Sequence, residues 1–145
     1  CLCVLGRSPG IKAVVCDGAF STMGTLVSYI RKWAPIYFPR WLAYRLPGFL
    51  ITYLSFLALK VSQRRLGRKL LTLEWGLRDN RTTPVFIIHG KRDSYIDARH
   101  ARWLYDHIRA SKEMWIVDGA RHNEAVVLKP DEYRKRVTTF LKEYV

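Results

Sequence analysis

Three apolar runs, each followed by a polar turn, set the pattern of this sequence. Residues 85–88 (VFII) form an unbroken, largely β-branched run that starts after Pro84, and residues 113–117 (EMWIV) form a second run. Runs of this length without polar alternation are typical of strands that are buried on both faces of a parallel sheet. Residues 11–16 (IKAVVC) predict a third strand.

Helical spacing fills the intervals between these runs. Apolar positions over residues 98–108 predict a helix, for which Asp97 is the expected N-cap. A last helix is expected from about Pro130, because proline suits the first turn and two acidic residues follow it. Strands that alternate with helices indicate an α/β fold with a parallel sheet of about three strands.

Residues 23–83 interrupt this alternation with a helical segment of different composition. Apolar residues over 26–33 have helical spacing, and Pro35 and Pro39 are expected to punctuate the stretch that follows them. Residues 46–59 are fourteen residues without a charge, whereas a membrane-spanning helix needs roughly twenty apolar residues. The pattern therefore predicts that residues 46–59 form a buried or interfacial helix. Residues 1–145 as a whole are expected to be a partial α/β domain, into which the helical segment is inserted.

The formal net charge of +13 is unevenly distributed along the chain. Residues 23–83 carry eleven basic and two acidic residues, a net +9, whereas residues 84–145 carry twelve and nine, a net +3. After the uncharged run, several cations fall on one helical side: Lys60, Arg64, Arg65, Arg68 and Lys69. This basic stretch is either a solvated face or a contact for an anionic membrane surface, and the aromatic residues before it suit either packing or an interface.

Composition places the chain among folded globular proteins, with 49% hydrophobic and 13% aromatic residues. The three cysteines are an odd number without metal-ligand spacing, which favours a reducing compartment. No signal peptide is visible before the first strand. We expect a cytoplasmic or peripheral membrane location.

The candidate chemistry follows the two strands of the C-terminal half. Asp93 comes just after the first of them and His122 just after the second, 29 residues later. In open α/β sheets, active sites gather at the carboxyl ends of the strands. A carboxylate that orients an imidazole is the acid/base half of a nucleophilic triad. Ser8 matches the G-x-S-x-G pattern of a nucleophile elbow, but Pro9-Gly10 and a strand follow at once and leave no room for the helix that the elbow requires.

The stretches IHGKRDSYIDARHARWLY, KEMWIVDGARHNEA and PDEYRKRVTTFL together resemble the C-terminal part of the α/β-hydrolase superfamily, above all its serine-aminopeptidase-like and dienelactone-hydrolase-like esterases. The resemblance implies that Asp93 is the triad acid, that His122 is the triad base and that residues 23–83 are a lid. Asp97 is a rival for the acid, because Ile96-Asp97 stands where the family often has Val-Pro.

The resemblance also implies a serine hydrolase for esters, thioesters or amides, without a metal or organic cofactor. The serine nucleophile would lie upstream, so we expect these 145 residues alone to be inactive. Two other hypotheses stay open. One is a non-catalytic basic module that binds anionic lipid or, less favoured because no nucleic-acid motif is present, nucleic acid. The other is a metal site drawn from four residues: His89, Asp93, His100 and His122.

Overall fold

A computed structural model describes residue 2, residues 10–67 and residues 73–145. The contacts within it divide the chain into two units. One unit contains Cys1–Ser21 and Leu73–Val145 and holds the sheet; the other, Thr22–Thr72, is helical. Ser8, whose elbow pattern was set aside above, lies outside the described residues, as do Arg68 and Lys69 of the basic stretch.

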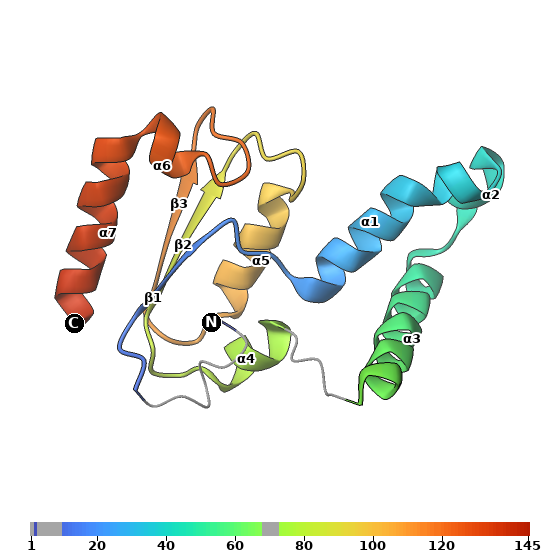
Figure 1. Ribbon diagram of the computed structural model, residues 1–145, viewed down its shortest axis with the longest axis horizontal. Coiled ribbons are helices and arrows are strands. Elements are labelled where there is room, and N and C mark those ends of the chain that lie inside the picture. Colours follow the sequence, from blue (N-terminus) through green and yellow to red (C-terminus); the bar gives the residue numbers. More distant parts are fainter. Residues whose placement is uncertain (1, 3–9, 68–72) are drawn as a thin grey trace. The chain divides into compact units, whose positions relative to one another are not determined.

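The sheet of the first unit has three parallel strands in the order β1-β2-β3 (Figure 1). They are β1 (Val14–Asp17), β2 (Val85–Gly90) and β3 (Lys112–Val117). Val14 pairs with Val85, and Val85 pairs with Lys112, so the three strands start level with one another. All six residues of β2 are buried, as expected for a central strand with neighbours on both sides. The expected α/β fold with about three parallel strands is confirmed.

Helices cover both faces of this sheet (Figure 1). They are α4 (Leu73–Asp79), α5 (Ala98–His107), α6 (Ala125–Leu128) and α7 (Pro130–Tyr144). On one face, Val85 and Ile87 of β2 pack with Leu104 of α5. On the other, Phe86 and Ile88 pack with Phe140 of α7. Successive side chains of a strand point to opposite faces, so the apolar run of β2 supplies both cores.

The expected helix at residues 98–108 is α5, which ends at His107, and the expected helix from Pro130 is α7. The first strand is shorter than predicted. Residues 11–13 come before the strand, because pairing with β2 starts at Val14, and Asp17 extends it at the other end.

The second unit consists of α1 (Thr22–Tyr37), α2 (Arg40–Arg45) and α3 (Gly48–Leu66). Pro35 lies inside α1, so the prediction that it punctuates the stretch after the helix was wrong. Phe38 N still donates to Ala34 O at 2.9 Å, because a proline removes only its own N–H. Pro39 does separate α1 from α2, and Pro47 precedes α3. Gly67 ends α3 in the left-handed region, with φ of 60°.

The uncharged run at residues 46–59 supplies the first two thirds of α3, but it is not a buried helix. Only Ile51 and Ser55 of α3 are buried. Among the described residues, no helix has both the length and the apolarity needed to cross a bilayer. The aromatic and apolar side chains of α3 therefore lie mostly on the surface of this unit.

Candidate active site

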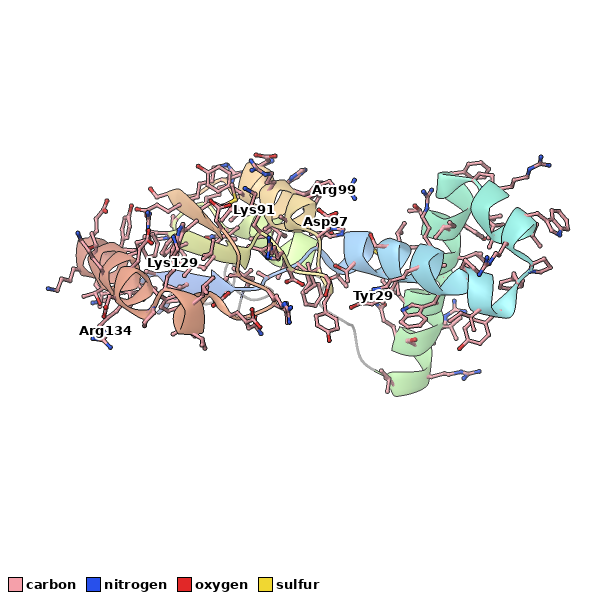
Figure 2. All side chains as sticks on the ribbon, turned by 90° about the horizontal axis from the view of Figure 1, so that it is seen from above. Tyr29, Lys91, Asp97, Arg99, Lys129 and Arg134 are labelled. Atoms are coloured by element: carbon pink, nitrogen blue, oxygen red, sulfur yellow. The ribbon has the colours of Figure 1, made fainter. Side chains whose placement is uncertain are left out.

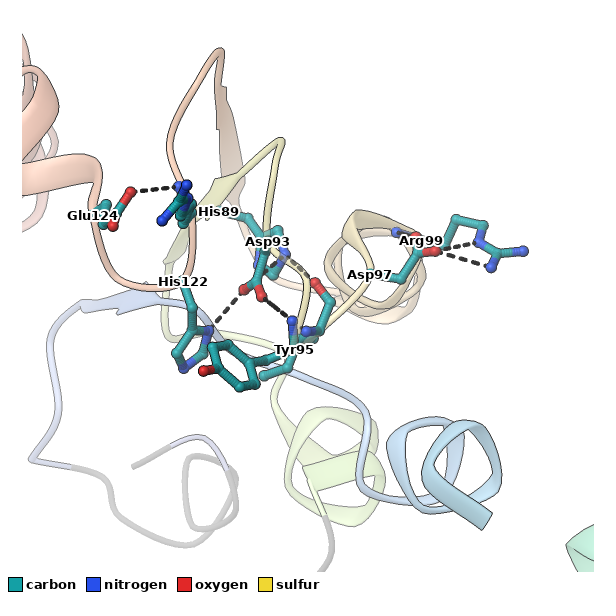
Figure 3. Close-up of polar contacts among 9 residues, drawn as sticks. His89, Asp93, Tyr95, Asp97, Arg99, His122 and Glu124 are labelled. Carbon is teal, nitrogen blue, oxygen red and sulfur yellow. Dashed lines mark hydrogen bonds and ion pairs between the residues drawn. The ribbon is translucent and has the colours of Figure 1, made fainter. Parts of the chain in front are cut away.

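Three polar side chains gather where the parallel strands end. Asp17 is the last residue of β1, Asp93 follows β2 by three residues, and His122 follows β3 by five. Since parallel strands place their carboxyl ends at one edge of the sheet, these loops meet there. Both sequence-predicted site residues, Asp93 and His122, are at this edge (Figure 3).

Asp93 and His122 are joined by a short hydrogen bond. His122 Nδ1 lies 2.7 Å from Asp93 Oδ2. The Asp93 side chain is only 1% exposed, whereas His122 is 31% exposed. A carboxylate can only accept, so Nδ1 carries the proton in this bond, and in the neutral ring the lone pair is then on Nε2. The imidazole is therefore held in the tautomer that a general base needs.

The other carboxylate oxygen of Asp93, Oδ1, accepts hydrogen bonds from the backbone of the turn after β2. Oδ1 accepts from Tyr95 N at 2.8 Å and from Ile96 N at 2.9 Å. Burial by itself would raise the pKa of Asp93, but the hydrogen bonds from Ile96 N, His122 and Tyr95 N outweigh it and hold that pKa below its ordinary value. Asp93 is thus an ionised acceptor for the imidazole near neutral pH.

The His89 side chain makes a hydrogen bond to the same turn. It is fully buried in β2, and its Nε2 donates to Ile96 O at 3.0 Å. Nε2 is also 3.6 Å from Asp93 Oδ2. His89 therefore fixes the backbone at Ile96 that donates to Asp93, and its role here is positioning. The sequence analysis named His89 only as a possible metal ligand, so this contact with the turn was not predicted.

Two glycines let the loops approach closely. A Cβ atom on Gly90 would collide with the carbonyl oxygens of Arg121 and Ala120, and Arg92 N donates to Ala120 O at 2.9 Å. Gly18 has φ of 70°, and a Cβ there would lie 3.2 Å from His122 Cε1. The loops after β1 and β2 thus both close on the loop that carries His122.

The His122 loop is shaped by its own contacts as well. Asn123 has a positive φ of 56°, which asparagine tolerates better than most residues. Arg121 N donates to Glu124 Oε2 at 3.0 Å. The Tyr95 ring meets the His122 ring edge-on, with centroids 5.8 Å apart (Figure 3). Tyr95 therefore lies against the imidazole, a neighbour that sequence spacing did not indicate.

Asp17 is a second carboxyl group at this edge that the sequence analysis missed. Its Oδ1 is buried and has no hydrogen-bond partner among the described residues. Burial raises the pKa of Asp17, while the nearby imidazoles of His89 and His122 and a hydrogen bond from Tyr133 of α7 oppose the rise. The available signal was a lone aspartate at the end of a predicted strand.

Asp97, the rival for the acid, has a different position. Its Oδ1 accepts from Arg99 N at 2.8 Å, which makes it the N-cap of α5, as predicted. Its Oδ2 forms an ion pair with Arg99 Nη2 at 2.9 Å. The side-chain and backbone hydrogen bonds from Arg99 lower the pKa of Asp97. This carboxylate is engaged at the start of the helix, whereas Asp93 meets His122.

The metal hypothesis named His100 together with the three residues at this edge. His100 lies on α5, and burial lowers its pKa. Within the part of the chain that the structure describes, no three His, Cys, Asp or Glu side chains are grouped so that they could hold a metal ion.

Comparison with solved structures gives the fold of the chain. The Pyrococcus furiosus esterase Pf2001 superposes with a TM-score of 0.62 at 19% identity, over 99% of this chain and 48% of that one. MGS-M2, an α/β-hydrolase enzyme from a deep-sea metagenome library, gives 0.57 at 15% identity, over 97% and 60%. The Pyrococcus horikoshii acylaminoacyl peptidase gives 0.56 at 14% identity, over 96% and 20%. No protein-family model matches the sequence.

The chain therefore has the fold of the C-terminal portion of an α/β-hydrolase, as the sequence resemblance implied. It spans about half the length of the esterase and less than two thirds of the other two proteins. At identities below 20%, these likenesses describe the arrangement of the backbone and not the reaction.

Proposed function

We propose that this chain is the acid/base portion of a serine hydrolase that cleaves ester, thioester or amide bonds. The observation that carries the proposal is the 2.7 Å hydrogen bond from His122 Nδ1 to Asp93 Oδ2 at the carboxyl edge of the sheet. The esterase and peptidase named above are compatible with this class of reaction.

In the proposed reaction, His122 Nε2 accepts the proton of a serine hydroxyl as the serine oxygen attacks the acyl carbon. Asp93 stabilises the imidazolium that forms and keeps the ring oriented. The imidazolium then returns the proton to the leaving group as the bond to the acyl carbon breaks. Water repeats the sequence to release the acid, and the serine hydroxyl is regenerated. The serine belongs to the part of the hydrolase outside these residues, and the helical segment at residues 23–83 would serve as its lid.

The test is turnover of short p-nitrophenyl esters by the complete protein that contains this chain. We expect Asp93→Ala and His122→Ala each to lower kcat/KM on the order of a thousandfold or more, since the loss of a triad member removes general-base catalysis. His107→Ala is the matched control, because His107 donates to Trp103 O and stacks on Trp103 on α5. Undiminished turnover by both the Asp93 and the His122 variants would contradict the proposal.

A fluorophosphonate probe adds a measurement that does not depend on the choice of ester. Such probes form a covalent bond with an activated serine. We expect the wild-type protein to be labelled on a serine outside this chain, and the His122→Ala variant to be labelled far more slowly. Equal labelling of both proteins would mean that His122 does not activate the nucleophile.

A further inference from the structure

The helical unit has an unusual charge composition. Residues 22–72 contain nine lysines and arginines and no aspartate or glutamate, whereas the rest of the chain contains the other 16 basic residues and all 12 acidic ones. The nine cations are Arg31, Lys32, Arg40, Arg45, Lys60, Arg64, Arg65, Arg68 and Lys69. No carboxylate within the unit can neutralise them, so the unit presents a field of one sign.

The outer face of α3 combines aromatic rings with two of these cations. Phe49, Tyr53 and Phe56 are 77%, 61% and 55% exposed, and Lys60 and Arg64 are exposed as well. Their spacing of three or four residues places all five on one face of a helix with about 3.6 residues per turn. We call these five residues the α3 outer stripe. The buried Ile51 and Ser55 lie on the opposite face.

The stripe changes character along the helix. Its aromatic residues occupy the first half of α3, and its cations follow in the second half. Lys60 Nζ lies 5.8 Å from the centre of the Phe56 ring, so the two halves adjoin. Aliphatic residues border the stripe, and each is exposed: Leu54, Leu57 and Val61.

A second group of exposed rings lies at the corner where α1 passes into α2. Tyr37 is the last residue of α1, Phe38 follows it, and Trp41 is the second residue of α2, next to Arg40; all three rings are exposed. Side chains project from the surfaces of all three helices (Figure 2). The pattern of exposed aromatic residues next to cations therefore recurs within this unit.

We propose that the helical unit is a docking surface for an anionic lipid bilayer. The aromatic part of the α3 outer stripe would enter the headgroup and upper acyl region, and Lys60 and Arg64 would meet the lipid phosphates. Aromatic side chains favour this depth of a membrane, and basic residues are attracted to anionic leaflets. Because α3 does not meet the requirements for a span, the contact is interfacial. This surface goes beyond the proposed hydrolase function and does not depend on it.

Charge and chemistry favour lipid over other occupants of this face. A second copy of the unit would bring nine further cations against the first nine, which is repulsive. Nucleic acid could bind the cations through its phosphates and the aromatic rings through stacking with its bases. It offers no apolar phase, however, for Leu54, Leu57 and Val61. An anionic bilayer supplies both a negative surface and an apolar interior.

The test is vesicle co-sedimentation of the complete protein, with phosphatidylcholine vesicles compared with vesicles that also contain phosphatidylserine. We expect at least tenfold stronger binding to the anionic vesicles and a steep loss with added salt. Lys60→Glu with Arg64→Glu should weaken that binding tenfold or more. Arg134→Glu with Lys135→Glu makes the same charge change at exposed positions of α7 and should leave the preference in place; Arg134 is labelled in Figure 2.

The aromatic residues are tested by a separate pair of variants. Phe49→Ser with Phe56→Ser should reduce binding, and the apolar pair Phe49→Leu with Phe56→Leu should retain most of it. If the serine pair does not fold, the charge variants decide the matter. The vesicle assay measures lipid binding without ester turnover, so its outcome is independent of the activity of the Asp93 and His122 variants and separates this proposal from the hydrolase proposal.

Several results would overturn the inference. One is equal binding to neutral and anionic vesicles, and another is equal weakening by the α3 and α7 charge variants. A third is a protein that binds no vesicles but self-associates through the stripe. A fourth is a protein that binds no vesicles but retards duplex DNA in a salt-dependent gel-shift assay.

Discussion

A Cβ atom on Gly90 would lie 2.5 Å from the carbonyl oxygen of Ala120, closer than side chains approach a neighbouring backbone in folded proteins. Gly90 is the last residue of β2, and Ala120 is buried in the loop between β3 and His122. The close approach lets Arg92 N donate to Ala120 O at 2.9 Å, one residue before Asp93. The absence of a side chain at Gly90 thus sets the distance between the loop of the acid and the loop of the base.

We therefore expect Gly90→Ala to force the two loops apart. Overpacking against backbone costs about 1–3 kcal/mol of the free energy of unfolding, and the displaced loops should also weaken the Asp93–His122 bond. Gly10→Ala is the matched control, because a Cβ at Gly10 meets nothing within 4 Å. Urea denaturation and ester turnover of both variants check this. Equal stability of the two variants would mean that the loops adjust without cost.

The sheet was predictable because its strands are marked by continuous apolar runs. The runs at residues 85–88 and 113–117 fall inside β2 and β3, and the helix expected from Pro130 is α7. The strand expected at residues 11–16 was misplaced, since its limits depend on where β2 offers partners and not on local composition. In the same way, Pro35 did not end α1, because Phe38 N still donates to Ala34 O past the proline.

The meeting of Asp93 and His122 could also be expected, because each follows a parallel strand and such strands end at one edge. The contacts that other residues make around Asp93 and His122 could not be expected from the sequence. Asp17 lies near His122 across a long separation in sequence, as does the Tyr95 ring, and His89 acts through the carbonyl oxygen of Ile96; single-residue patterns carry no record of those contacts.

Substitutions of Asp93 and Asp97, the two carboxylates of the 93–97 turn, should have different effects on activity and stability. Asp93→Asn keeps an acceptor for Tyr95 N and Ile96 N but loses the charge beside His122, so kcat should fall on the order of a thousandfold or more. Asp97→Ala loses the N-cap of α5 and should cost about 1 kcal/mol of stability with little change in kcat. Parallel thermal melts and steady-state kinetics distinguish the two. A large fall in kcat for Asp97→Ala alone would assign the acid to the rival residue.

Asp17 should make stability depend on pH. Its folded pKa is raised from an ordinary value of 3.8, mainly by burial. A folded state that holds its proton more tightly than the unfolded state is most stable at low pH, and this contribution declines as pH rises from about 3.8 through the raised folded pKa. Asp17→Asn removes this titration but keeps an acceptor for Tyr133. We therefore expect the Tm of the variant relative to wild type to increase between pH 3.5 and pH 7. A difference that does not vary with pH would contradict the raised pKa.

Cys16 should be nearly inert in the folded chain. It pairs with Ile87 in the sheet and packs against the core on the α5 side. Burial raises the pKa of its thiol from 9.0 to about 12. Near pH 8 the thiolate fraction then falls by about a thousandfold, and the thiolate is the form that alkylating reagents attack.

The measurement is iodoacetamide alkylation of the Cys1→Ser, Cys3→Ser variant, in which Cys16 is the only thiol left in this chain. Mass spectrometry of the peptide that contains Cys16 gives the rate in buffer and in urea. We expect native alkylation to be slower by two orders of magnitude or more and to follow the opening of the β1–β2 pairing, because only opening restores both access and the ordinary pKa. If the rate in buffer equals the rate in urea, Cys16 is not part of a packed sheet, and the raised pKa of its thiol is contradicted.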